Sequence, residues 1–210
     1  MTRRPFRHES EDVRRQDLVA ATLDCIADYG LKGATVRQIA ERAGVTPGLI
    51  RHYFVSKDKM FEAAYRKILD RMFTTSMEIA ARHGGDPIAR FRSFVLANFR
   101  GEIIAPSTIA LWATFVSQIG VDPTLARMHR ESYLAFLETI ERLLQDVLEA
   151  AGKAPDKAEI RRLAIAANAL LDGLWLEGGV AGDMFAEGEL GTIALVGMSR
   201  LVGVPLAEDD

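Results

Sequence analysis

The 210-residue sequence has one cysteine, Cys25, so the chain cannot form an internal disulfide. It contains no glycine-rich phosphate loop after a strand, no Gly-x-Ser-x-Gly segment and no His-Glu-x-x-His segment. Its four histidines share no spacing typical of metal ligands. These absences argue against an enzyme and against a bound metal or cofactor. Tryptophan is also scarce, since only Trp112 and Trp175 occur.

Long apolar runs and an apolar leader are missing as well. Asn, Asp or Pro interrupts the apolar runs well before the roughly 18 residues that a membrane span needs, and the chain begins with the charged stretch MTRRPFRHESED. We therefore expect a cytoplasmic protein with no membrane partner. The net charge of −3 is unevenly distributed: residues 1–66 carry 12 Lys and Arg against 9 Asp and Glu, whereas residues 67–210 carry 14 against 20. A basic N-terminal part suits a polyanionic partner.

Apolar residues recur almost everywhere with the helical period, and no stretch alternates for more than a few residues. This pattern predicts an all-α fold of about nine helices. Thr35, Asp86 and Asp122 are candidate N-caps, and Pro47 suits the first turn of a helix. Three short helices precede a long fourth one. We therefore expect a small DNA-binding head in residues 1–56 and a helical bundle in residues 57–210.

The segment TVRQIAERAGVTPGLIRHYF, residues 35–54, has the pattern of a helix-turn-helix. Ala43 and Gly44 supply the small residue and the positive φ that a sharp corner between two helices needs. Packing of Val45 and Ile50 leaves an exposed side on the second helix for Thr46, Gly48, Leu49, Arg51, His52 and Tyr53. The same spacing also fits an ordinary αα-hairpin that serves packing only.

Together with Lys57, this segment resembles the head of TetR-family transcriptional repressors. The resemblance implies an all-α dimer with a helix-turn-helix head and a ligand-binding C-terminal domain. Members usually carry Tyr-Tyr-His before the phenylalanine, where this chain has Arg51, His52 and Tyr53.

Site roles follow from chemistry and from this match. Thr35 can offer its hydroxyl and backbone N–H to a DNA phosphate, and Lys57 matches the phosphate-contacting lysine of the family. Arg51 is suited to bidentate reading of guanine or to a phosphate contact. Thr46 and His52 are candidates for base or backbone contacts, and Arg37 and Gln38 are weaker candidates.

Several later stretches, ALWATF, DPTLARMHR and ALLDGLWLEGG, are similar to the branch of this family that senses choline and controls glycine-betaine synthesis. Aromatic faces, above all those of tryptophan, attract a quaternary ammonium group. The residues proposed for the ligand site are Trp112, Phe115, Tyr133, Asp172 and Trp175, with Glu177 as a further source of negative charge. Core packing is the alternative for the aromatic residues, and a structural partner is the alternative for Asp172.

Small residues are frequent in the last two helices: Ala164, Ala166, Ala167, Ala169, Gly191, Ala194 and Gly197. They permit close helix contact, either in the four-helix dimer interface that the family implies or in a pair within one chain. A two-fold dimer suits a palindromic operator. The sequence thus predicts a ligand-responsive repressor. A regulator of another ligand and a helical interaction module remain alternatives.

Overall fold

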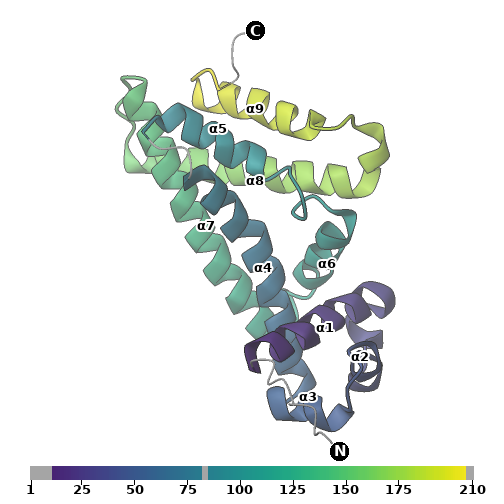
Figure 1. Cartoon of the computed structure of the whole chain (residues 1–210). Coiled ribbons are helices and arrows are strands. Elements are labelled where there is room, and N and C mark those ends of the chain that lie inside the picture. Colours follow the sequence, from purple (N-terminus) through teal and green to yellow (C-terminus); the bar gives the residue numbers. More distant parts are fainter. Residues whose placement is uncertain (1–10, 82–84, 207–210) are drawn as a thin grey trace, which may run out of the picture. The chain divides into compact units, whose positions relative to one another are not determined.

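The computed structural model describes residues 11–81 and 85–206. Within these residues all regular structure is helical, with nine α helices, one 3-10 turn and no strand (Figure 1). The predicted all-α class is thereby confirmed. The first ten residues of the expected head lie outside the described residues. The chain divides into two compact units, residues 1–67 and 68–210, with the division inside the fourth helix.

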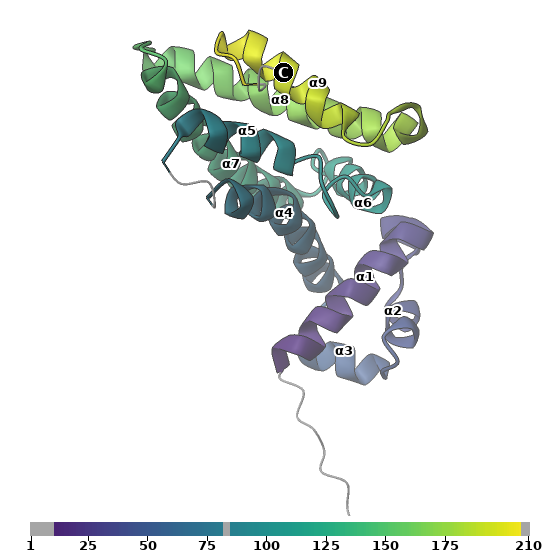
Figure 2. The same cartoon turned by 45° about the horizontal axis from the view of Figure 1, so that its top comes forward.

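The N-terminal unit contains α1 (Glu11–Gly33), α2 (Val36–Arg42), α3 (Pro47–Tyr53) and the start of α4 (Lys57–Ala81). Gly30 takes φ 69° and ψ 172°, which interrupts α1 near its C-terminal end. In Figure 2, α1 runs alongside the pair formed by α2 and α3. The core of this unit includes Leu18, Ile26, Ile39, Ile50 and Phe54.

The corner between α2 and α3 forms as the sequence predicts. Gly44 has φ 64°, a conformation that L side chains adopt only with strain. Thr35 caps α2 in a capping box with Gln38, and Thr46 caps α3 ahead of Pro47 in its first turn. The Ser56 hydroxyl accepts a hydrogen bond from the Lys59 N–H at 3.2 Å and so caps α4.

The C-terminal unit contains the rest of α4, then α5 (Pro87–Ala97), α6 (Pro106–Val116), α7 (Pro123–Ala150), α8 (Lys157–Ala181), the 3-10 turn η1 (Gly182–Met184) and α9 (Glu189–Val202). Asp86 and Asp122 cap α5 and α7, as expected. Helix α8 packs against α6, α7 and α9, and α5 packs against α7 and α9. Both views show α8 and α9 side by side and antiparallel.

Most of the small residues of α8 and α9 are used for packing within the chain. Ala164, Ala167 and Ala194 are buried. A Cβ on Gly191 would meet Leu96 of α5 at 3.2 Å, and one on Gly197 would meet Leu170 of α8 at 2.8 Å. The alternative of an intrachain helix pair therefore accounts for these positions. Larger apolar side chains face outward instead: Ile165, Leu176 and Val180 on α8, and Ile193 and Val196 on α9.

One segment among the described residues, Lys157–Met184, is long and apolar enough to cross a membrane by length and composition, with a mean hydropathy of 1.2 in its best window. This corrects the expectation drawn from the apolar runs, since Asp172 interrupts the run without making the helix polar. Two features of α8 explain its composition. One face lies against α6, α7 and α9, and the outward face carries Ile165, Leu176 and Val180.

Candidate nucleic-acid interface and ligand cavity

Helix α3 presents the residues that the sequence predicts for DNA contact. Gly48, Arg51 and His52 are exposed, while Leu49 and Tyr53 are half-buried. Ile50 is 3% exposed and fixes the opposite face of the helix in the core. The rings of His52 and Tyr53 meet edge to face with centroids 5.3 Å apart. Arg51 therefore has its guanidinium on an anchored helix with a free outer face, the arrangement that a groove-reading helix needs.

Both predicted threonines act first as helix caps. The Thr35 hydroxyl donates to Gln38 Oε1 at 2.6 Å and accepts from the Gln38 N–H at 3.3 Å. The Thr46 hydroxyl accepts from the Leu49 N–H at 3.4 Å. The side chain of Gln38, a weaker candidate for DNA contact, is thus held in the capping box. Arg37 is exposed on the first turn of α2.

Two cations of the N-terminal unit lie over aromatic rings. The Lys57 ammonium is 4.8 Å from the centroid of Phe61, and the Arg15 guanidinium is 5.0 Å from that of Phe54. By contrast, Lys59 forms an ion pair with Glu62 at 2.8 Å. A cation over a ring keeps its charge available to a third group, whereas an ion pair largely neutralises it. Lys57 is therefore the better placed of the two lysines for a phosphate.

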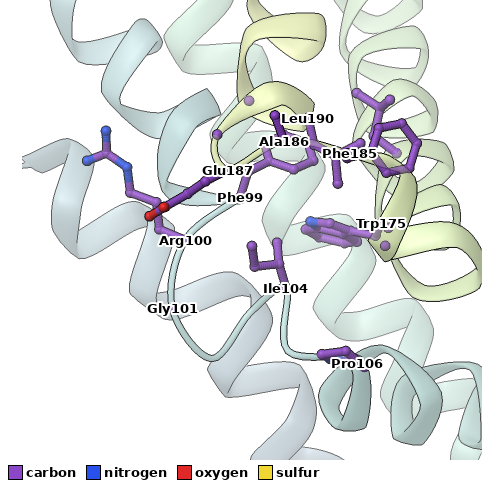
Figure 3. A pocket seen from close by; sticks show the side chains of 15 residues that line it. Phe99, Arg100, Gly101, Ile104, Pro106, Trp175, Phe185, Ala186, Glu187 and Leu190 are labelled. Carbon is purple, nitrogen blue, oxygen red and sulfur yellow. The ribbon is translucent and has the colours of Figure 1, made fainter.

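A cavity of about 620 Å³ lies in the C-terminal unit (Figure 3). Its walls come from the loop after α5, the second half of α8, the turn around η1 and the start of α9. Aromatic side chains from three of these segments line it, namely Phe99, Trp175 and Phe185. Arg100 and Glu187 line the cavity as well and are both exposed, so they form its rim. The volume is within the range of small-molecule sites.

Trp175 is the one residue predicted for the ligand site that lines this cavity. The Trp112 ring contacts the Trp175 ring edge to face, with ring centroids 6.2 Å apart, and Trp112 is 7% exposed. Phe115 is fully buried on the same helix as Trp112. Tyr133, half-buried on α7, and Glu177, exposed on α8, do not line it. Phe99, Phe185 and Glu187 were missed, because only the fold brings residues 99–106 beside residues 174–191.

Asp172 has the structural partner that the sequence leaves open. The Asn168 side-chain amide donates to Asp172 Oδ2 at 2.8 Å, one helical turn away on α8. Burial raises the pKa of the Asp172 carboxyl from 3.8 to about 6, and the hydrogen bond from Asn168 partly opposes this rise. Asp172 does not line the cavity.

Comparison with known proteins matches both units. Residues 18–64 match the model of the TetR family of bacterial regulatory proteins, and residues 87–201 match that of the C-terminal domain of BetI-type transcriptional repressors. The chain belongs to the TetR family. It is a TetR-family transcriptional repressor with a BetI-type C-terminal domain, which confirms the resemblance seen in the sequence and the expectation of a regulator in place of an enzyme.

The names of related proteins agree with this assignment to the TetR family and to its BetI type. It is 34% identical over 172 residues to the HTH-type transcriptional regulator BetI of Burkholderia mallei, covering 82% of this chain and 85% of that one. The protein of the same name from Burkholderia lata is 35% identical over 173 residues, covering 81% and 84%.

Solved structures share the TetR-family fold. A transcriptional regulator from Pseudomonas aeruginosa superposes with a TM-score of 0.85 at 29% identity, over 95% of both chains. A regulator from Saccharomonospora viridis, solved in complex with choline, superposes with a TM-score of 0.73 at 17% identity, over 88% of this chain and 94% of that one.

Proposed function

We propose that the protein is a cytoplasmic, choline-responsive repressor that binds a palindromic operator as a homodimer. The observation that carries the ligand assignment is the cavity lined by Phe99, Trp175 and Phe185. Three aromatic side chains suit a trimethylammonium group, which has no N–H to donate and is held by ring faces. The Glu187 carboxylate at the rim adds negative charge beside the exposed Arg100. The Saccharomonospora viridis regulator solved with choline supports the same ligand class.

The DNA part of the proposal rests on α3. Arg51, exposed beside His52 on a helix anchored by Ile50, is assigned to base reading, and Lys57 to a phosphate. Thr35, Arg37, Thr46, Gly48, Leu49 and Tyr53 complete the proposed contact surface. Because Thr35 and Thr46 cap α2 and α3, their main contribution to DNA binding is to orient the backbone N–H groups at the starts of these helices.

The dimer part rests on the outward apolar side chains of α8 and α9. Ile165, Leu176 and Val180 are 41, 44 and 85% exposed, and Ile193 and Val196 are 40 and 41% exposed. Large apolar side chains left exposed on two neighbouring helices are typical of an interaction surface. Pairing of the same face on two copies would give the two-fold symmetry that a palindromic operator requires.

Fluorescence anisotropy with a labelled duplex from the region upstream of the chain's own gene tests the proposal. The wild-type protein should bind this duplex far more tightly than a shuffled one, and choline should weaken binding, because a ligand that favours one conformation shifts the operator equilibrium by its differential affinity. Arg51→Ala should lose about 1–3 kcal/mol of discrimination at one position in each half-site. Tight operator binding that choline leaves unchanged would point to another effector.

A further inference from the structure

The outward face of α9 is symmetric about its own midpoint. The exposed residues on this face are Glu189, Ile193, Val196 and Arg200. Their spacing of 4, 3 and 4 residues places them on one side of the helix, with the midpoint halfway between Ile193 and Val196. If α9 pairs antiparallel with a second copy of itself about this midpoint, Ile193 faces Val196 and Glu189 faces Arg200. Apolar side chains then meet apolar ones, and each carboxylate meets a guanidinium.

The outward face of α8 has the same kind of symmetry. The exposed residues on this face are Ile165, Ala169, Leu176 and Val180. Their spacing of 4, 7 and 4 residues is symmetric about a midpoint between Asp172 and Gly173. Antiparallel pairing of two α8 helices about this midpoint places Ile165 opposite Val180. Next to the midpoint, the Asp172 carboxylate accepts a hydrogen bond from the buried Asn168 amide, and Gly173 has no side chain that would hinder a second helix.

The two midpoints lie at the same level of the helix pair. Leu170 of α8 occupies the space next to Gly197 of α9. The α8 midpoint follows Leu170 by as many residues as the α9 midpoint precedes Gly197, and the two helices run antiparallel (Figures 1 and 2). The contact of Leu190 with Gly178 gives the same level to within one residue. A single two-fold axis can therefore relate both helices to their copies, which two midpoints at different levels would forbid.

The charged residues of α9 suit this axis. Within the described residues Arg200 has no ion-pair partner, and Glu189 uses only Oε2, which accepts from the Ala186 N–H at 2.7 Å. Both residues lie about 8 Å along the helix from the midpoint, where two crossing helices are still close. Arg162 and Asp183 are also equidistant from the α8 midpoint and opposite in charge. They lie about 16 Å from it, so Glu189 and Arg200 are the better placed pair.

We propose that two copies pair α8 on α8 and α9 on α9, each antiparallel, and that ion pairs between Glu189 and Arg200 of the partner subunit fix this register. The inference rests on the dimer of the proposed function and adds its axis and its selective contacts. Symmetry makes each ion pair occur twice. A chain with another charge pattern on α9 would meet like charges or none, so the pairs also favour a second copy of this chain over other partners.

Single cysteines test the register in the full-length protein, because its one native cysteine is buried. Gly173→Cys lies beside the axis and should form a disulfide with the same residue of a second copy on mild oxidation. The chain has room for it, since a Cβ there would meet nothing within 4 Å. Val180→Cys is the matched control. Two copies of it would lie about 22 Å apart along the helix, so it should crosslink with Ile165→Cys in a mixture but not with itself.

Charge reversal tests the ion pairs. Glu189→Arg and Arg200→Glu should each weaken the homodimer about 10-fold, because like charges replace both pairs. In a mixture of the two variants every pair is again of opposite charge, so native mass spectrometry should find heterodimers well above the half that random exchange gives. Rescue in the mixture also shows that each variant folds. The chain with both changes should form homodimers with nearly wild-type affinity.

A control reversal separates a specific pair from net charge. Glu138→Arg changes an exposed residue of α7, away from the outward face of α8 and α9. It should leave the homodimer unchanged, and its mixture with Arg200→Glu should show no preference for heterodimers. Glu189→Gln keeps an acceptor for the Ala186 N–H and removes only the charge, so it should weaken the homodimer less than Glu189→Arg does.

The outcomes distinguish the two proposals. If the wild type is a dimer but Val180→Cys crosslinks with itself and Gly173→Cys does not, the register is wrong while the dimer of the proposed function stands. If the charge reversals leave the homodimer intact, or their mixture shows no excess of heterodimers, the ion pairs are wrong. A wild-type chain that is monomeric at micromolar concentration overturns both the register and the dimer.

Discussion

Leu170 of α8 occupies the space next to Gly197 of α9, where an added Cβ would lie 2.8 Å from Leu170 Cδ2. The backbones of these two helices approach closely because position 197 has no side chain. A large charged residue at Gly197, or at the buried Ala167, would therefore disrupt the packing of a single chain. Loss of dimers in such a variant would say little about the interface. A substitution that tests dimerisation should therefore be made on the outward face of α8 and α9.

Val180→Glu should convert the protein to monomers and weaken operator binding. Val180 is 85% exposed on the apolar face of α8, so the new carboxylate costs the isolated chain little but would be buried unpaired in a dimer. Light scattering at micromolar concentration measures the change. Val121→Glu is the control, because Val121 is also an exposed valine, at 77%, but lies in the connection between α6 and α7. A dimer that survives Val180→Glu would move the interface elsewhere.

Lys57→Ala should weaken binding to operator and shuffled duplexes by the same factor and reduce the salt dependence of binding. The Lys57 ammonium lies over Phe61 with its charge available, so its removal should cost one phosphate contact, or about one unit in the slope of log affinity against log salt. Lys59→Ala should have a much smaller effect, because Lys59 is paired with Glu62. Anisotropy titrations at several salt concentrations measure both slopes. Identical slopes for the two variants would contradict the assignment.

Gly44→Ala and Gly48→Ala should change stability in opposite directions, and Gly48→Ala should also weaken operator binding. Gly44 has φ +64°, so alanine there should lower the free energy of unfolding by about 1 kcal/mol. Gly48 is helical and has room for a Cβ, so alanine should raise stability by a few tenths of a kcal/mol. The same Cβ stands on the exposed side of α3, and operator affinity should fall. Denaturant unfolding and anisotropy separate the effects; unchanged operator affinity in Gly48→Ala would remove Gly48 from the contact surface.

Asp172→Asn should make the protein less sensitive to pH. The carboxyl pKa is about 6 in the folded chain, above its unfolded value of about 3.9. The folded state therefore binds more protons between these values, and wild-type stability should fall as pH rises from 4 to 7. The variant removes the charge and keeps an acceptor for Asn168, so its advantage in stability should grow by about 2 kcal/mol between pH 4.5 and 7.5. Thermal unfolding of both proteins at pH 4.5 and 7.5 measures this; a constant difference would refute it.

Local structure in the head was predictable because its signals are short. Thr35, Gly44 and Pro47 each act within four residues along the chain, through a cap, a positive φ or a fixed φ, and the structure confirms all three. The same holds for Asp86 and Asp122 ahead of the prolines that start α5 and α7. Which face of α3 is exposed also follows from the spacing of Ile50 and Phe54, both buried.

The cavity was only partly predictable. Trp175 was a candidate because tryptophan is rare here, but Phe99 meets it only through packing between segments about 75 residues apart, and Phe185 only through the turn around η1. Sequence spacing carries no signal for such contacts. The outward apolar face of α8 and α9 was also missed. The small residues of α8 and α9 could not distinguish an interface between two chains from packing within one chain, because close helix packing favours the same residue types in both cases.

The edge-to-face contact of Trp112 and Trp175 gives the protein an intrinsic fluorescent probe. These are the only two tryptophans of the chain, and their ring centroids are 6.2 Å apart. Two indoles at this distance exchange excitation energy, so light absorbed by either ring is emitted from a single place beside the cavity. All tryptophan emission of the protein therefore comes from this one pair of rings, and changes around Trp175 can be monitored without a dye or an added residue. Displacement of the Trp175 ring would separate the pair and would be seen as a change in emission polarisation.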